Sequence, residues 1–275
     1  MATVEDYYGK KESRIGYRLF LRDAQHFGLY PLVGDSNISE WEAQKRHHDR
    51  IFAQLDLEAG HKVLDIGCGR GIVAKDLSQR YGLDITGIDL TPYIVEEAKK
   101  NNSMLDNPPT FINGSYQELP FEHDSFDGLY AVETLSHATD LAKAVEEAFR
   151  VVKPGRKSVF FEYKIDEDVE LTEYEKRMYD LVNEGSSMAS LDKFTGNTFK
   201  ELLEKTGFRD VKVTDVSLEA EKSFRRLYRF ARFPYFFIRL FGLQKTFINA
   251  TAAVEYYKLA RKGYLRYCIY EGVVA

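Results

Sequence analysis

The stretch that decides the fold is Val63-Leu64-Asp65-Ile66-Gly67-Cys68-Gly69-Arg70-Gly71. It begins as an apolar run that is typical of a buried strand, and the residues after its glycines have helical spacing. Glycines in such a turn let the backbone bend tightly and approach a ligand closely, because no Cβ atom is in the way. Their spacing differs from the dinucleotide pattern, in which the third glycine lies one residue further along. The stretch therefore predicts a strand, a ligand-binding turn and a helix.

Strand-like and helical patterns alternate from residue 62 onward, which is typical of a parallel sheet with crossover helices. The strands are expected at 62–66, 84–89, 110–113, 126–133, 158–163, 211–216 and 264–274. Helices are expected at 41–55, 72–81, 91–101, 140–152 and 198–206. The pattern predicts one α/β domain with additions at 1–55, 166–195 and 219–262.

Asp89 ends the second expected strand, 18 residues beyond Gly71. A carboxylate at this place can accept hydrogen bonds from both hydroxyl groups of a ribose. Together with Asp65 before the glycines, it indicates a ligand that contains a nucleoside.

With Asp65, Gly67, Gly69, Gly71 and Asp89 in these places, the sequence resembles the class I S-adenosylmethionine-dependent methyltransferases. The resemblance implies a Rossmann-like sheet of seven strands, S-adenosylmethionine as cofactor and S-adenosylhomocysteine as product. It places the amino-acid part of the cofactor on the glycine turn and the ribose on Asp89. Residues 113–121 resemble the loop that packs on adenine, although Ser115 stands where an acidic residue is usual. The expected cofactor-binding residues are Asp65, Gly67, Cys68, Gly69, Gly71, Asp89, Leu90, Ser115, Tyr116 and Glu133.

The same resemblance divides the single domain, 1–275, into parts with different expected roles. Residues 1–55 would form an N-terminal helical cover, and 56–165 the cofactor-binding half. Residues 166–275 would form the substrate-side half, with a helical insert at 219–262 before the last strand.

A narrower resemblance concerns the methyl acceptor. The segments 130–137, 161–163 and 251–255 are similar to those of the sterol C24-methyltransferase branch. The tryptophans of that branch are missing from 23–30, which favours the wider group of bacterial prenyl C-methyltransferases, including the type in teleocidin biosynthesis. The resemblance implies methyl transfer to a double bond of a hydrophobic prenylated or terpenoid small molecule.

Such a reaction leaves a carbocation, which needs a pocket without water and aromatic faces that stabilise positive charge. Aromatic residues make up 14% of the chain, and many lie in the additions. Each of them could instead simply pack a cover onto the core. The expected substrate-binding residues are Tyr8, Phe20, Phe27, Tyr30, Tyr163 and Tyr179.

The reaction ends with the loss of a proton or with ring closure, so a base is expected at the carboxyl ends of the strands. The expected catalytic residues are His137, Glu133, Glu162 and Tyr163. His137 has an unperturbed pKa near 6.5, which suits a base at neutral pH. It could instead be held by a hydrogen bond in its loop, and Glu133 could orient it or bind the cofactor's amino group. No metal is expected, because the helical neighbours His47 and His48 point about 100° apart.

The composition excludes several classes of protein. The 38 basic and 43 acidic residues give a net charge of −5, which argues against a general nucleic-acid binder. Two cysteines cannot form a disulfide framework, and we see neither a secretory signal nor an apolar run that spans a membrane. We expect a cytoplasmic homo-oligomer.

The segment 222–245 holds seven basic residues, eight aromatic residues and no acidic one. It could form a membrane-surface contact, a pocket wall, a diphosphate site, or a packed cover or subunit contact. Three alternatives to prenyl C-methylation stay open: O- or N-methylation of an aromatic metabolite, sterol methylation, and a catalytically silent cofactor-binding scaffold.

Overall fold

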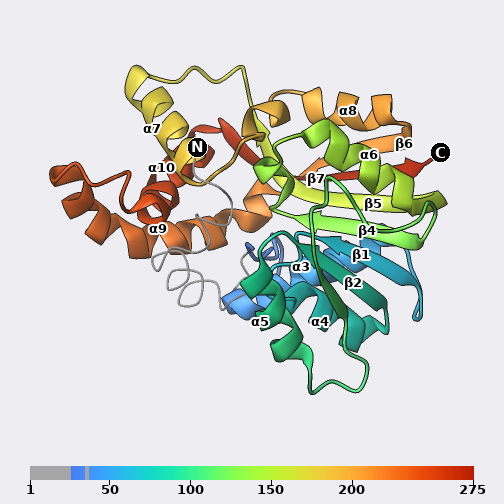
Figure 1. Ribbon diagram of the computed structural model, residues 1–275. Coiled ribbons are helices and arrows are strands. Elements are labelled where there is room, and N and C mark those ends of the chain that lie inside the picture. Colours follow the sequence, from blue (N-terminus) through green and yellow to red (C-terminus); the bar gives the residue numbers. More distant parts are fainter. Residues whose placement is uncertain (1–25, 35–36) are drawn as a thin grey trace.

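The computed structural model describes residues 26–34 and 37–275 (Figure 1). Its centre is a sheet of seven strands in the order β3-β2-β1-β4-β5-β7-β6. The strands are β1 (Lys62–Ile66), β2 (Asp84–Asp89), β3 (Thr110–Asn113), β4 (Phe126–Val132), β5 (Val152–Ile165), β6 (Phe208–Asp215) and β7 (Leu265–Val274). Only β7 runs against the others, between β5 and β6. The α/β class and the seven strands predicted from the sequence are confirmed.

Helices cover both faces of this sheet (Figure 1). One face is covered by α3 (Glu40–Leu55), α4 (Ile72–Tyr81) and α5 (Pro92–Asn102), and the other by α6 (Leu141–Val151) and α8 (Thr198–Thr206). Neighbouring residues of the central strands therefore point into different cores. In β1, for example, Val63 packs with the first group of helices and Leu64 with the second.

Local sequence explains where several helices begin and end. The Asp140 side chain accepts a hydrogen bond from the Lys143 amide, which is the predicted cap of α6. Ser39 and Glu42 form a reciprocal capping box at α3. The expected helix 91–101 is α5, which begins one residue later than predicted. The Thr91 side chain makes no capping bond, and Pro92 stands at the start of the helix, where its fixed φ angle favours helical backbone.

β5 begins earlier than the sequence predicted, at Val152 rather than Ser158. Phe126 of β4 pairs with Val152 and Gly128 with Lys157, so the intervening residues bulge from the ladder. Pro154 lies in this bulge, where its missing N–H breaks no sheet hydrogen bond. The residues between the expected helix 140–152 and the expected strand 158–163 thus belong to an irregular strand.

The remaining helices lie at the carboxyl ends of β5 and β6. They are α7 (Glu173–Gly185), α9 (Ser217–Leu240) and α10 (Ile248–Lys262), and α9 continues through Pro234. The pair α9–α10 projects from the sheet as a hairpin (Figure 1). No helix among the described residues is long and apolar enough to cross a membrane.

Residues 26–30 cross the edge where the parallel strands end. The Leu29 amide donates to the Ala43 carbonyl of α3, and the Tyr30 amide donates to the Glu219 carbonyl of α9. This segment ties α3 to the projecting hairpin, so residues from distant parts of the chain meet above β1 and β4.

Candidate active site

The glycine turn between β1 and α4 has a backbone that only glycine adopts easily. Gly67, Gly69 and Gly71 have φ angles of +72°, +51° and +73°. A Cβ atom on Gly67 would lie 2.1 Å from Oγ1 of Thr134, and one on Gly71 would lie 2.4 Å from Cζ of Phe111. The neighbouring residues therefore leave no room for a side chain at Gly67 or Gly71. The accessible side of the turn faces the carboxyl ends of the strands.

Asp89 is fixed in place at the end of β2. Its Oδ2 accepts from the Gly69 amide at 3.0 Å, and its Oδ1 accepts from the Thr91 amide at 2.9 Å. Burial raises the pKa of this carboxyl, and the two amides oppose that effect. Each oxygen keeps a second lone pair, so the carboxylate can still accept two hydroxyl groups from a ligand.

Asp65 lies at the bottom of the same region. It is buried, and its Oδ2 accepts from the Tyr130 hydroxyl at 2.8 Å. Burial raises the pKa of Asp65 to about 7, with the Tyr130 hydrogen bond opposing this and Asp89 adding to it. No described residue forms an ion pair with Asp65, so a bound ammonium group would give this carboxylate its counter-ion.

A pocket lies between the glycine turn, the end of β2 and the turn after β4. Its cavity has a volume of about 120 Å³ and is partly open to solvent. Nine of the ten predicted cofactor-binding residues line it, and Gly71 stands behind the wall at the start of α4. Several wall residues were not predicted from the sequence, among them Ile72, Gln117, Thr134 and Thr139, which belong to no motif.

His137 lines the pocket from the turn after β4. Its Nδ1 lies 3.1 Å from the Ser187 carbonyl oxygen, and burial lowers its pKa. A carbonyl oxygen can only accept, so Nδ1 carries the hydrogen and Nε2 of the neutral ring has a lone pair. A neutral imidazole has the basicity to accept a proton at neutral pH.

Glu133 links the pocket wall to the N-terminal segment and to β7. Its backbone has a φ of +52°, and its Oε1 accepts from the Phe27 amide at 3.1 Å and the Tyr267 hydroxyl at 2.8 Å. Burial raises its pKa to about 8, while the bonds from Phe27, Tyr267 and Tyr163 pull it down. At pH 7 most of this side chain is therefore protonated. Such a strained residue at a pocket indicates a functional constraint.

Glu162, another predicted catalytic residue, does not line the pocket. It is fully buried in β5, and its Oε1 accepts from the Thr134 and Leu135 amides. Burial raises its pKa to about 7, and the amides oppose this. Thr134 packs against Gly67, and its amide is held by Glu162. We therefore interpret Glu162 as a residue that positions the turn after β4.

His26 also lines the pocket, and the sequence analysis missed it. Its Nε2 lies 3.1 Å from Nε2 of His48, and Nδ1 of His48 lies 2.8 Å from Oδ2 of Asp76. The carboxylate holds the hydrogen on Nδ1 of His48, so His26 donates from Nε2 and has its lone pair on Nδ1. His26, His48 and Asp76 are far apart in the sequence, so no spacing signal could have joined them.

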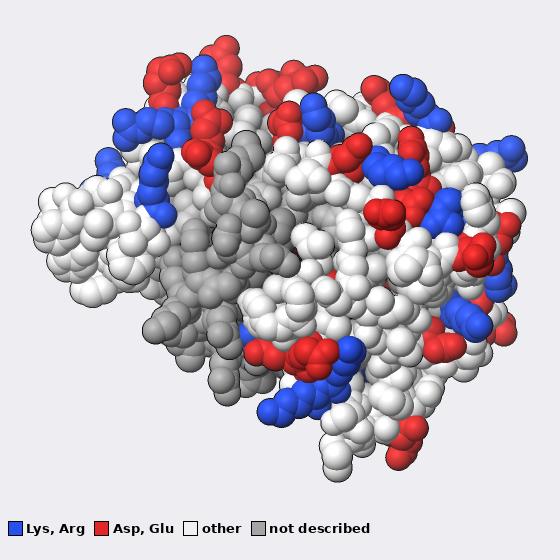
Figure 2. All heavy atoms as spheres, in the orientation of Figure 1, with Lys and Arg blue, Asp and Glu red and all other residues white. Residues whose placement is uncertain are grey.

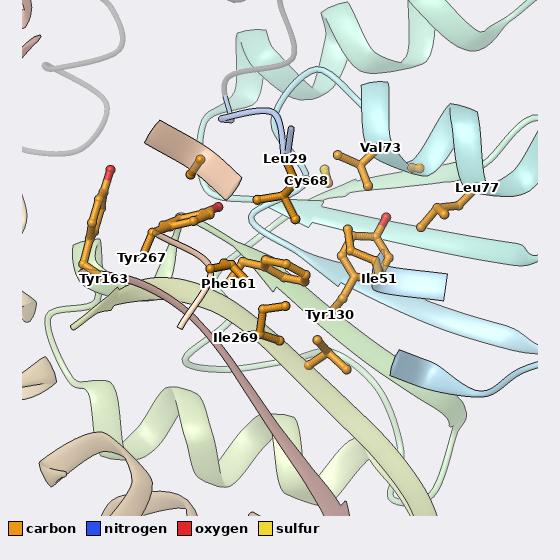
Figure 3. Packing of buried hydrophobic residues seen from close by; sticks show 14 of the residues in the cluster. Leu29, Ile51, Cys68, Val73, Leu77, Tyr130, Phe161, Tyr163, Tyr267 and Ile269 are labelled. Carbon is orange, nitrogen blue, oxygen red and sulfur yellow. The ribbon is translucent and has the colours of Figure 1, made fainter. Parts of the chain in front are cut away.

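Five aromatic rings form a cluster next to Glu133, and Figure 3 shows two of them, Tyr163 and Tyr267, side by side. Neighbouring ring centroids in the cluster are 4.1–6.4 Å apart. Tyr179 stacks on it at 6.3 Å. The members of this aromatic cluster are Phe27, Tyr163, Phe224, Tyr256 and Tyr267.

Of the other predicted substrate-binding residues, the structure describes only Tyr30. Tyr30 is turned away from the cluster, with its hydroxyl on Glu40 at 3.1 Å and the Lys222 ammonium over its ring. Tyr8 and Phe20 lie outside the described residues. Phe224 and Tyr256 were not singled out, because nothing in the sequence places them beside Phe27.

Comparison with known proteins agrees with this geometry. Residues 64–160 match a family model described as "Methyltransferase domain". The chain is 30% identical, over 93% of its length and 89% of the relative's, to the S-adenosyl-L-methionine-dependent Diels-Alderase iccD of Talaromyces variabilis. The chain belongs to the S-adenosylmethionine-dependent methyltransferase family. The methyltransferase is also 28% identical to 24-methylenesterol C-methyltransferase 3 of Arabidopsis thaliana, over 72% of this chain and 55% of that one.

Solved structures share the fold of this methyltransferase. The cyclopropane synthase MmaA2 of Mycobacterium tuberculosis superimposes with a TM-score of 0.80, at 16% identity, over 97% of this chain and 95% of that one. S-adenosylmethionine is the cofactor of the family, and the pocket fits it. The unpaired buried carboxylate of Asp65 suits its ammonium group, the free lone pairs of Asp89 suit its ribose, and the half-exposed Leu90 offers an apolar surface beside them.

Proposed function

We propose that this methyltransferase transfers a methyl group to a carbon–carbon double bond of a hydrophobic, prenylated or terpenoid small molecule. The observation that carries the proposal is the aromatic cluster, two of whose members, Phe27 and Tyr267, donate hydrogen bonds to Glu133 of the pocket wall. Two further observations support it: the narrower sequence similarity to a sterol C-methyltransferase, and an imidazole that is neutral at pH 7 in the pocket wall.

The bound cofactor supplies an electrophilic methyl group. The π electrons of the acceptor form a bond to this methyl carbon while its bond to sulfur breaks, which leaves a cation on the second alkene carbon. Loss of a proton from a neighbouring carbon then restores a double bond. The chain's own residues must therefore keep water away, stabilise the cation and accept a proton.

The residues of the site suit these three tasks. The ring faces of the aromatic cluster attract positive charge without reacting with it. Glu133 is mainly protonated at pH 7, so it puts no full negative charge beside the cation to trap it. We assign proton acceptance to Nε2 of His137, and His26, whose proton the His48–Asp76 pair can share, is the second imidazole in reach of the pocket.

A second candidate function is cyclisation of a polyene without methyl transfer. It is favoured by the similarity to a Diels-Alderase over most of both chains. In that case the cofactor would shape the pocket, and the same aromatic walls would hold a folded apolar substrate.

The test is incubation of the protein with methyl-labelled S-adenosylmethionine and a panel of acceptors. The panel holds prenylated indoles, sterols, prenyl diphosphates, phenols and linear polyenes, and each product is analysed by mass and by the position of the label. Label on a carbon of a former double bond supports the proposal. Label on oxygen or nitrogen assigns the protein to the O- and N-methyltransferases. An unlabelled product of unchanged mass with a new ring assigns it to the cyclases.

A further inference from the structure

The projecting hairpin of α9 and α10 ends in an apolar surface. Six large apolar side chains near its end, four of them phenylalanines, are between 39% and 73% exposed. Monomeric soluble proteins seldom expose so many large apolar side chains together, and such patches mark interaction sites. We call this group the apolar tip: Phe233, Phe236, Phe237, Leu240, Phe241 and Leu243.

The hairpin does not need these side chains for its own packing. Its inner face is held by Tyr235, Ile238 and Val254, which are buried together. The Tyr235 hydroxyl also donates to Oε1 of Glu255 at 2.7 Å, which locks α9 to α10. The apolar tip lies on the opposite side of α9, where its residues recur every three or four positions along one helical face.

Basic residues flank the apolar tip. Arg229, Arg232 and Arg239 follow one side of α9, and Lys245 follows the tip in the loop before α10. All four are exposed, and none forms an ion pair with a described residue. From 222 to 254 the chain holds seven basic residues and no acidic one, although its net charge is −5. Asp180 and Glu184 of α7 share a hollow with Arg177 and Lys245.

The shape and the charge of this surface indicate which kind of partner it binds. Figure 2 shows the hairpin end as a projecting lobe that is mostly white and carries no red on the visible face. A convex tip with phenylalanines in the middle and arginines at the side matches the pattern of helices that insert into the interface of a bilayer. Two copies of the tip facing each other would bring like charges together, which disfavours self-association.

We propose that the apolar tip docks on membranes that contain anionic lipids. The phenylalanines would enter the boundary between headgroups and acyl chains, while Arg229, Arg232 and Arg239 contact lipid phosphates. The positive hairpin on a negative protein would turn this end toward a negative surface during approach. Docking of this kind would place the protein where hydrophobic molecules dissolve.

The test is co-sedimentation of the full chain with vesicles of 70% phosphatidylcholine and 30% phosphatidylglycerol, and with vesicles of phosphatidylcholine alone. We expect binding to the anionic vesicles at least about tenfold stronger than to the neutral ones, and weaker binding in 0.5 M salt. Phe233→Ser/Leu240→Ser should weaken binding about tenfold or more. Arg232→Gln/Arg239→Gln should weaken it by a similar factor on anionic vesicles only.

The matched control is Leu218→Ser/Met104→Ser. These two side chains are 75% and 94% exposed, so the control removes as much exposed apolar surface outside the apolar tip. It should bind vesicles like the parent protein. Unfolding temperature and cofactor affinity should be unchanged in all variants, which separates lost docking from lost folding. A tryptophan in place of Phe236 should shift its emission to the blue on vesicles and be quenched by brominated lipids.

Two results would overturn the proposal. One is the absence of binding to anionic vesicles, or equal binding by the tip variant and its control. The other is a dimer by light scattering that Phe233→Ser/Leu240→Ser converts to a monomer, without any binding to vesicles. That second result would assign the tip to a second copy of this chain.

Discussion

The glycine turn lines the cofactor pocket and the aromatic cluster packs behind Glu133 of the pocket wall, and the two are built in opposite ways. The turn depends on the backbone, through positive φ angles at three glycines and amides that hold Asp89. The cluster depends on side chains, which come from the N-terminal segment, β5, α9, α10 and β7. The turn has no room for a Cβ atom at Gly67 or Gly71, whereas rings spaced 4.1–6.4 Å apart can be exchanged for others of similar size.

This difference explains how one family can keep its cofactor and change its acceptor. A backbone site tolerates few substitutions, because strain and collision both oppose them. A side-chain site changes its shape with each substitution but keeps its apolar character. Mutations should therefore separate the two regions clearly: those in the turn should act on cofactor binding, and those beside the cluster on turnover.

The largest expected effect concerns His137. His137→Gln removes the lone pair of Nε2 at the pocket but keeps an amide that can donate to the Ser187 carbonyl. Turnover with the acceptor found by the labelling panel should fall by about 10²–10⁴, as for the loss of a general base. Cofactor affinity by calorimetry should stay within about twofold.

The control for His137 is His123→Gln, because His123 is exposed and lies outside the pocket wall. It should leave turnover unchanged. If His137→Gln keeps full activity, the proton goes elsewhere, and His26→Gln should then show the loss instead. A loss of cofactor affinity in His137→Gln would assign this histidine to cofactor binding rather than to turnover.

The next effect concerns the closed turn. Gly67→Ala puts a Cβ atom 2.1 Å from Oγ1 of Thr134 at a φ of +72°. We expect cofactor affinity to fall by about 10² or more, because the turn or Thr134 must move. Gly155→Ala is the matched control, since its φ is +78° but no atom lies within 4 Å of the new Cβ. It should lower stability by about 1 kcal/mol and leave the dissociation constant unchanged.

A smaller effect is expected at the two ends of β2. Asp89→Ala removes the acceptor for the ribose, so the cofactor dissociation constant should rise about tenfold or more. Asp84→Ala changes the exposed first residue of the same strand, and should not affect it. Equal calorimetric affinities for the two variants would contradict the assignment of Asp89 to the ribose.

The comparison also shows what the sequence could predict. The glycine turn and the strand that ends in Asp89 are local patterns, so they could be predicted, and the family resemblance that they carry supplied the rest of the nine predicted residues in the pocket wall. His26, His48 and Asp76 lie on three separate segments, and their hydrogen bonds exist only after the sheet places those segments together. Glu162 shows the opposite case. Its position at the end of a strand predicted a catalytic role, but its side chain accepts hydrogen bonds from two backbone amides instead of lining the pocket.

The smallest expected effect tests whether Glu133, which joins the two regions, is protonated at pH 7. Its pKa is about 8 in the folded protein and near 4.5 in an unfolded chain, so the folded state binds one more proton between these values. Stability should therefore fall as the pH rises through this window, by about 1.4 kcal/mol per pH unit for this one group. Urea unfolding of the cofactor-free protein at pH 6 and pH 7 should show a drop that is smaller by about this amount in Glu133→Gln. Glu146→Gln, an exposed glutamate on α6, should keep the parent drop. If the parent and Glu133→Gln lose equal stability over this range, Glu133 is already ionised, and it would stand beside the aromatic cluster as a fixed negative charge rather than as a neutral hydrogen-bonding group.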